Sequence, residues 1–192
     1  MKKLVVMASL VAVSTSMMAM DLQYFLGAGA ERADADFKVS AVASNGNSAS
    51  ETISDDASSL KLKFGVILDK THRISLSHVN YGIEDGGDFR IILGNYDYLI
   101  PVNEDFRFLA GVHLGNANYE TNDDFKMSGL AYGVQVGAIY DITKNVEFEL
   151  GLAYTKYNVD KTLNYTDNGV DIEAKLELED STSMFAGINY KF

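Results

Sequence analysis

The stretch Met-Phe-Ala-Gly-Ile-Asn-Tyr-Lys-Phe, residues 184–192, decides the fold of this chain. In an extended strand, successive side chains point to opposite faces. One face here is apolar and consists of Met184, Ala186, Ile188, Tyr190 and Phe192. The other is mostly polar or small and consists of Ser183, Gly187, Asn189 and Lys191, with Phe185 as its exception. The pattern predicts a strand between an apolar medium and a polar interior.

The same period-two alternation recurs along the chain and indicates strands rather than helices. It is regular over residues 22–29, 60–69, 106–115, 132–141 and 146–155. Two further segments, about 73–83 and about 89–100, are apolar but change parity midway. A β-bulge at a position that the sequence does not give could restore the register.

Connections between these segments alternate in length. Residues 69–72, 101–104 and 141–145 are tight turns, whereas 40–59, 84–88, 120–126 and 158–174 are longer and acidic. Short turns at one end and long loops at the other are typical of transmembrane β-barrels, which also satisfy every backbone group within lipid. The sequence therefore predicts an all-β chain forming an eight-stranded antiparallel up-and-down transmembrane β-barrel. The loop 40–59 is expected to be mobile.

The first residues have the order of a secretory signal. Lys2 and Lys3 precede an apolar run over residues 4–13 and a small, polar run over 14–19. This run is too short to span a membrane as a helix. We expect a signal peptide over residues 1–19, with cleavage possible after residue 20, and a barrel domain over 20–192. A secreted transmembrane barrel implies the bacterial outer membrane, with both termini periplasmic.

Composition excludes several other classes. A net charge of −11 without a basic patch argues against nucleic acid as a partner. The chain has no cysteine, which rules out disulfides and a lipid anchor on cysteine. A secreted soluble barrel of lipocalin type is the alternative for the alternation. The terminal Phe192, the absence of tryptophan and the polar face of glycines and charges argue against it.

Inward charges are predicted to form two clusters of mixed sign. Near the outer end we place Glu31, Lys61, Lys63, Glu177 and Glu179. Near the periplasmic end we place Asp69, Arg107, Asp141, Glu147, Glu149 and Lys191. An eight-stranded barrel is only wide enough for its own side chains, and inward glycines would make room for long ones. The lumen is then either plugged by ion pairs or, as the alternative, a narrow selective pore.

Residues for catalysis or a cofactor are not evident. The histidines are His72, His78 and His113, and none is followed two residues later by serine. Ser77 and His78 are adjacent in a strand, so their side chains face opposite ways. The loop carboxylates match the spacing of no defined calcium site. We therefore expect no enzyme, no cofactor and no metal.

The signal, the turn-and-loop rhythm and the closing Tyr190-Lys191-Phe192 resemble those of the small outer-membrane β-barrel family, which includes the OmpA membrane domain, OmpX and the opacity-type proteins. The resemblance implies contact with outer-membrane lipid and lipopolysaccharide. It also implies recognition of the last strand by the barrel-assembly machinery, with Tyr190 and Phe192 at the matching positions. It favours a monomeric structural or surface-interaction protein that binds a host or surface ligand through its loops. The alternative is a small passive porin-like channel.

Overall fold

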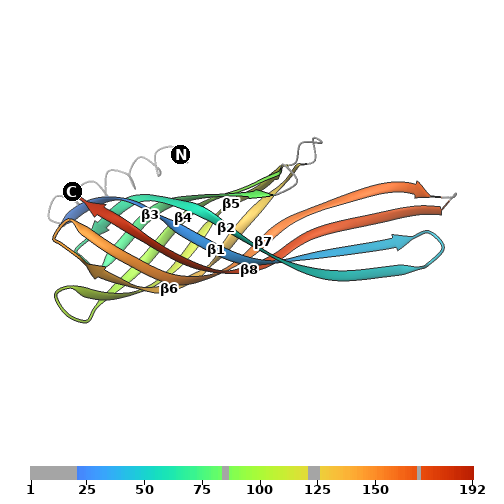
Figure 1. Cartoon of the computed structure of the whole chain (residues 1–192). Helices are drawn as coiled ribbons and strands as arrows, with labels where there is room; N and C mark the ends of the chain where they lie inside the picture. The colour runs from blue at the N-terminus through green and yellow to red at the C-terminus, as the bar shows by residue number, and fades with distance from the viewer. Residues whose placement is uncertain (1–20, 84–86, 121–125, 168–169) are drawn as a thin grey trace, which may run out of the picture.

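The computed structural model describes residues 21–83, 87–120, 126–167 and 170–192, and all its regular structure is β-strand (Figure 1). The expected signal peptide over 1–19 and parts of the predicted loops 84–88, 120–126 and 158–174 lie outside these residues. Within them, no helix is long and apolar enough to cross a membrane. The eight strands are β1 (Leu22–Ala43), β2 (Ser48–Leu68), β3 (His72–Ile83), β4 (Gly87–Pro101), β5 (Phe106–Glu120), β6 (Lys126–Asp141), β7 (Val146–Asp167) and β8 (Val170–Lys191).

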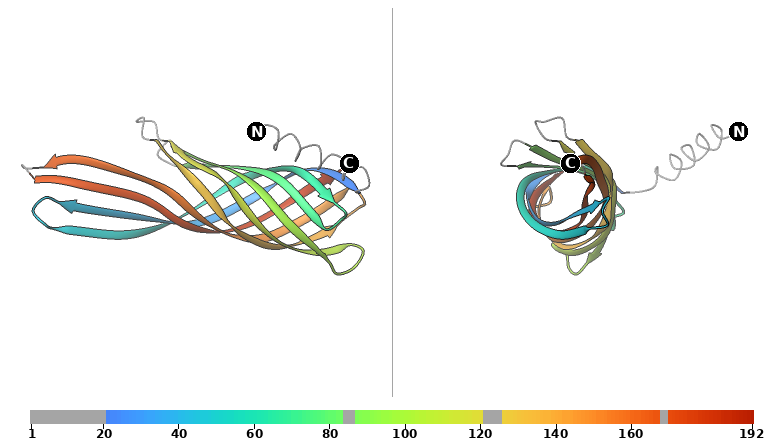
Figure 2. Two further views of the ribbon diagram at one scale, coloured as in Figure 1. Left: turned by 180° about the vertical axis from the view of Figure 1, so that it is seen from behind. Right: turned by 90° about the vertical axis from the view of Figure 1, so that its right-hand side faces the viewer.

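The strands form a closed antiparallel barrel in which each pairs with its neighbours in sequence. Closure comes from β1 and β8, which pair from Phe25↔Lys191 onward. The end-on view in Figure 2 shows the resulting ring. The predicted eight-stranded up-and-down barrel is confirmed. We call the end with the tight turns the base and the opposite end the mouth.

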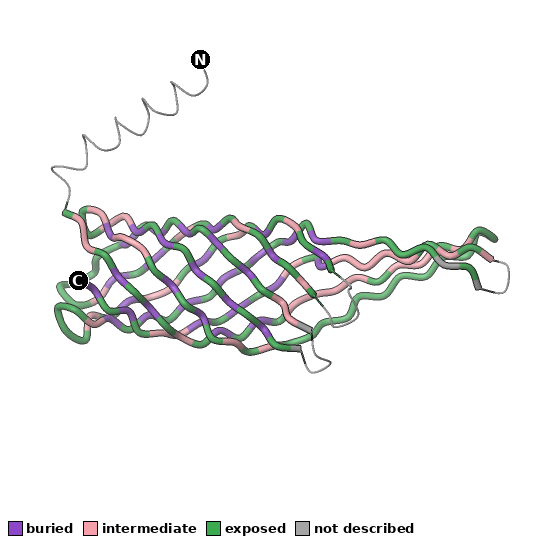
Figure 3. The backbone as a smooth tube through the Cα atoms, turned by 90° about the horizontal axis from the view of Figure 1, so that it is seen from above, coloured by how far each residue is buried: buried purple, intermediate pink, exposed green. Residues whose placement is uncertain are grey.

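Burial alternates along every strand of the barrel, as Figure 3 shows. On the terminal strand Ile188 and Tyr190 are exposed on the outer wall, while Asn189 and Lys191 are buried inside. Phe185 also points inward and is only 3% exposed. Outward aromatic side chains gather at the base: Tyr24, Tyr98, Phe108, Tyr140, Phe148, Tyr190 and Phe192. The apolar outer face has the form expected of a wall against lipid.

The change of parity in β3 and β4 has a different cause from the one expected. Their pairing is continuous from His72↔Tyr98 to Ile83↔Gly87, so the predicted bulges are wrong. Instead, apolar residues such as Val79 and Ile91 point into the barrel. The lumen itself changes from polar to apolar toward the mouth. A register shift does occur in β8, where Leu178 and Asp180 pair with consecutive residues of β1 and leave Glu179 unpaired.

Two long hairpins project beyond the barrel (Figure 1). The expected mobile loop 40–59 is mostly regular strand, because β1 continues to Ala43 and β2 resumes at Ser48. The expected loop 158–174 likewise belongs to β7 and β8. Alanine and aspartate are weak strand formers, so the composition of these segments suggests loops. The two hairpins nevertheless form strands, because β1 and β8 remain paired by backbone hydrogen bonds as far as Ala43 and Ile172.

We call this extension the projecting sheet. It begins at a row of paired residues, Ile53, Phe37, Leu178 and Val159, and contains residues 37–43, 48–53, 159–167 and 170–178. In the described chain, β3 pairs with β2 only from Lys61, and β6 pairs with β7 only up to Asn158. The projecting sheet is therefore open, with one edge on β2 and the other on β7.

Candidate functional site

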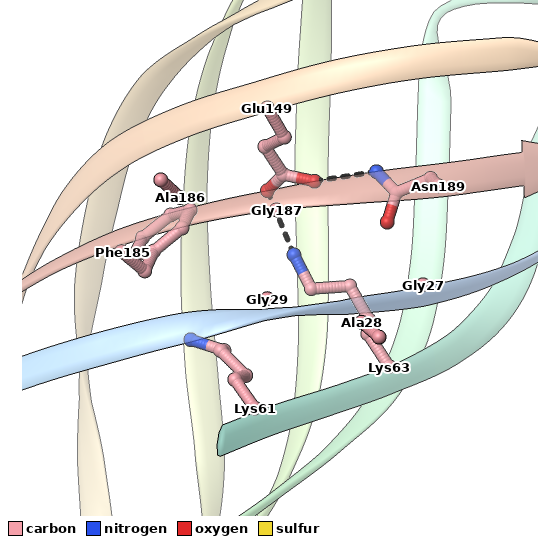
Figure 4. A pocket seen from close by; sticks show the side chains of 10 residues that line it. All are labelled: Gly27, Ala28, Gly29, Lys61, Lys63, Glu149, Phe185, Ala186, Gly187 and Asn189. Carbon is pink, nitrogen blue, oxygen red and sulfur yellow. Dashed lines mark hydrogen bonds and ion pairs between the residues drawn. The ribbon is translucent and has the colours of Figure 1, made fainter. Parts of the chain in front are cut away.

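An ion-pair network fills the middle of the lumen, and Arg73 lies at its centre. The Arg73 side chain is fully buried. Its guanidinium donates to Asp97, with Nε at 2.9 Å and Nη2 at 2.8 Å from Oδ2, and to Glu149, with Nη1 at 2.8 Å from Oε2. Lys63 Nζ reaches the other oxygen of Glu149 at 2.7 Å, and Asn189 donates to the same carboxylate at 2.8 Å (Figure 4). Five strands, β2, β3, β4, β7 and β8, are thus tied together across the lumen.

The network continues to the base through Glu147, which is also fully buried. Arg107 Nη2 lies 2.8 Å from Glu147 Oε2 and 3.0 Å from Asp141 Oδ1. Lys191 forms ion pairs with the same two carboxylates. Arg73 Nη1 lies 3.9 Å from Glu147 Oε1 and joins the basal group to the central one. The basal charges therefore compensate one another away from bulk water.

Toward the mouth, a second ion pair links Lys61 and Glu31. Their atoms Nζ and Oε2 are 2.5 Å apart, and both side chains are 8% exposed. Tyr81 donates its hydroxyl to the other oxygen of Glu31 at 2.8 Å. Lys61 Nζ also lies 4.3 Å from the ring centroid of Phe185, which explains why an aromatic residue occupies the otherwise polar face of β8. Figure 4 shows Lys61 and Lys63 pointing toward this region from β2.

The structure brings most of the predicted lumen charges together, but as one chain of contacts. It places Glu31, Lys61, Lys63, Arg107, Asp141, Glu147, Glu149 and Lys191 inside the barrel. Lys63, assigned to the outer cluster, binds Glu149 of the basal one. The network extends over much of the lumen because long side chains from neighbouring levels reach one another.

Three predicted lumen residues lie elsewhere. Asp69 is exposed in a tight turn with φ 48° and accepts a hydrogen bond from the backbone of Asp21. Glu177 lies in the projecting sheet, where Lys175 Nζ is 2.6 Å away, and this hydrogen bond raises the pKa of Lys175. Glu179 is at the register shift and lies 3.9 Å from Lys38 on the exposed surface. Side-chain alternation counted from the base predicted that Glu177 and Glu179 point into the lumen. The register shift at Glu179 reverses the two faces of β8, and Glu177 lies beyond it in the projecting sheet.

The sequence did not identify several members of the network. Arg73 and Asp97 are fully buried, and Gln135 donates to Asp97. Arg73 and Asp97 come from the two strands whose parity was ambiguous. A signal was present in the polar spacing Arg73, Ser75, Ser77 and Asn95, Asp97, which is period two within otherwise apolar strands.

Inward glycines leave space for these long side chains. A Cβ atom at Gly111 would overlap Asp97 Oδ1, and one at Gly27 would overlap Asn189 Oδ1. At Gly133 a Cβ would lie 2.6 Å from His113 Nε2. The glycines therefore match the positions where neighbouring strands contribute long polar groups.

Apolar side chains close the lumen around the network. Near the base lie Phe25, Ile67, Leu99, Leu109 and Ile139. A larger apolar cluster near the mouth includes Val79, Tyr81, Ile91, Leu93, Met127 and Tyr157. In the described chain only three buried side-chain polar atoms lack a hydrogen-bond partner: Ser75 Oγ, Arg107 Nε and His113 Nδ1.

An aromatic pocket opens above this upper layer, where the projecting sheet leaves the barrel. It has a volume of about 50 Å³. Its lining combines aromatic, alanine and a few polar side chains: Ala33, Ala35, Phe37, Asp55, Ala57, Tyr81, Phe89, Tyr119, Tyr157 and Ser181. We call it the mouth pocket.

The histidines are not placed as catalytic partners of Ser77. His113 is buried with Nε2 3.0 Å from Thr155 Oγ1, and His72 Nδ1 lies 2.8 Å from the Tyr96 hydroxyl. His78 is exposed on the outer wall, whereas Ser77 is buried inside. Within the residues that the structure covers, no group of three or more histidine or acidic residues is arranged to hold a metal ion. The predicted assembly residues Tyr190 and Phe192 lie together on the outer wall, with ring centroids 6.2 Å apart.

Comparison with solved structures identifies the fold. Neisserial surface protein A (NspA) is similar with a TM-score of 0.61 and 18% identity, covering 88% of this chain and 97% of that one. The outer membrane protein OprG from Pseudomonas aeruginosa gives a TM-score of 0.62 and 14% identity over 88% of this chain and 95% of its own. OprH from P. aeruginosa gives a TM-score of 0.53 and 21% identity, covering 83% of this chain and 99% of its own.

These three proteins are bacterial outer-membrane barrels, and the chain has the fold of small eight-stranded barrels of this kind. No protein-family model matches the sequence. No curated protein matches it significantly either.

Proposed function

We propose that this protein is a non-enzymatic outer-membrane barrel with a closed lumen that acts outside the membrane through its acidic projecting sheet. The fully buried Arg73, held between Asp97 and Glu149 across the barrel, is the observation that carries this proposal. An outer wall of exposed aliphatic side chains suits contact with lipid and lipopolysaccharide. In this proposal the termini are periplasmic, residues 1–19 are a removed signal, and the barrel is a monomer.

A closed lumen follows from the energetics of buried charge. Removing an ion from water costs several kcal/mol unless partners and hydrogen bonds compensate it. Glu149 accepts hydrogen bonds from Arg73, Lys63 and Asn189, so protein groups compensate its charge. Apolar side chains lie toward the mouth and near the base. The charges that continue to the base are themselves paired with one another. These contacts favour a plugged barrel over the porin-like alternative.

The projecting sheet is the exposed part best suited to a partner. Carboxylates outnumber cations there and include Glu51, Asp160, Asp171, Glu173 and Glu177. Lys38, Lys161 and Lys175 are the cations of the sheet itself. Such a surface attracts a basic partner over several ångströms at moderate salt. The outward Tyr190 and Phe192 remain the proposed contact with the assembly machinery.

Electrical recording tests the closed lumen. We expect the refolded protein, confirmed by a heat-modifiable gel band, to produce no current steps in a planar bilayer. The double substitution Lys63→Ala and Glu149→Ala removes a matched pair from the plug, and we expect this variant to open brief conducting states. Stable current steps from the unaltered protein would overturn the plug and favour the channel.

Shortening one hairpin tests the external role. Replacing residues 38–52 with Asn-Gly joins Phe37 to its partner Ile53 and leaves the lumen network intact. This variant loses one lysine, Lys38, and one glutamate, Glu51, so we expect it to fold and to bind an immobilised basic polypeptide at low salt about as well as the unaltered protein. Replacing residues 160–177 in the same way joins Val159 to Leu178, removes five carboxylates and two lysines, and is expected to weaken that binding at least about tenfold. Unchanged binding by both variants would exclude the projecting sheet as the interacting surface.

A further inference from the structure

The mouth pocket has two unlike walls. Tyr81, Phe89, Tyr119 and Tyr157 come from four strands on one side. Alanines of β1 and β2 form the other, together with Phe37. Large rings opposite small methyl groups leave a cavity of about 50 Å³ at the rim of the barrel. The cavity is a consequence of this residue choice.

The ring faces, rather than the hydroxyls, are available to a ligand. The Tyr81 hydroxyl donates to Glu31 at 2.8 Å, and the Tyr157 hydroxyl lies 2.9 Å from Ser181 Oγ. Phe89 is central, with its ring centroid 6.1 Å from that of Tyr81 and 6.0 Å from that of Tyr157. The plane of the Phe89 ring is inclined by 25° to that of Tyr81 and by 65° to that of Tyr157, so the three rings face the pocket at different angles.

The lining of the pocket carries negative charge and no positive charge. Asp55 is a lining residue, and none of the lining residues is basic. Lys61, the cation paired with Glu31 beneath Tyr81, lies over the Phe185 ring and is not a lining residue. A phenol that donates to a carboxylate, as Tyr81 does, has a more electron-rich ring. Aromatic faces attract cations through their quadrupole, and the acidic surroundings raise the local concentration of cations.

We propose that the mouth pocket binds a small organic cation of the quaternary ammonium class. Methylated ammonium groups have no N–H to satisfy, so ring faces and alanine methyls suit them better than a polar site would. Asp55 supplies the compensating charge at the rim. An anion would meet a carboxylate without a basic partner. The pocket would bind this ligand whether or not the projecting sheet engages a protein.

The test compares choline with its uncharged carbon analogue, 3,3-dimethylbutan-1-ol. The two have nearly the same shape, so only charge separates them. The mature protein is refolded in a maltoside micelle, because choline-headgroup detergents would compete. Calorimetric titration is expected to show saturable choline binding, with the neutral analogue at least about tenfold weaker. Equal affinities, or no saturable choline binding, would overturn the proposal.

Two variants locate the site. Asp55→Asn is expected to weaken choline binding several-fold and leave the neutral analogue unchanged. Asp56→Asn is the matched control, because Asp56 is exposed and paired with Arg32 on the other face of the strand. Phe89→Leu removes the central ring and is expected to abolish measurable binding in a barrel that still shows heat-modifiable mobility. Choline binding that survives Phe89→Leu would place the ligand elsewhere and reject the mouth pocket.

Discussion

Replacing Arg73 by Met is expected to lower the free energy of unfolding by about 3 kcal/mol or more. Breaking a buried ion pair from one side leaves its partners uncompensated, which typically costs 3–5 kcal/mol. Asp97 would retain only Gln135 among its side-chain partners described above, while Glu149 would retain Lys63 and Asn189. Urea unfolding in micelles, followed by the heat-modifiable band, measures the loss.

Arg32→Met is the matched control for this experiment. Arg32 Nη2 lies 2.7 Å from Asp56 Oδ2, but the two side chains are 62% and 52% exposed. Exposed pairs contribute about 1 kcal/mol or less. If both substitutions cost the same small amount, the lumen network does not hold the barrel together, and the argument for a plug loses its energetic basis.

Gly133→Val is expected to prevent refolding of most of the protein, whereas Gly94→Val is expected to be tolerated. A Cβ at Gly133 would overlap the backbone carbonyl of Tyr154 and crowd His113. At Gly94 the nearest atom is the Leu114 carbonyl oxygen at 3.6 Å, an ordinary contact. Overpacking typically costs about 1–3 kcal/mol, and a clash with backbone belongs at the upper end or beyond.

The fraction of folded band after dilution from urea separates the two glycine variants. Both substitutions add the same isopropyl group to a transmembrane strand, so intrinsic strand propensity is matched. Equal yields would mean that neighbouring strands can shift apart at Gly133. The close approach of β6 to β7 would then not be needed for assembly.

The faces of most strands were predictable because alternation has a fixed period of two. Lys61, Lys63, Glu147 and Glu149 were assigned inward on this basis, and the structure places them there. Arg73 was missed because β3 carries apolar residues on both faces near the mouth, so hydrophobicity alone gives no face. Inward Val79 and Tyr81 are explained only when the apolar upper layer is known.

The exterior was predicted less well, for a physical reason. Glu179 was placed inside because a single unpaired residue reverses every assignment beyond it, and sequence gives no sign of a register shift. The projecting hairpins were missed because their ladder joins residues far apart in sequence, such as Phe37 with Leu178. Local composition describes a loop, while pairing across β1 and β8 makes a sheet.

The length of the projecting sheet determines how far the protein extends beyond its barrel, and therefore which part of it a large particle outside the cell reaches first. From Phe37 to Ala43, six residues at roughly 3.3 Å each carry the chain roughly 20 Å beyond the row where the sheet begins. With the barrel oriented as proposed, an antibody or phage approaching through the sugar layer meets this tip first. The turn at Gly46, with φ 90°, joins β1 to β2 at this tip. Substitutions of the exposed residues next to Gly46 would change the surface presented at the tip while the barrel beneath remains the same.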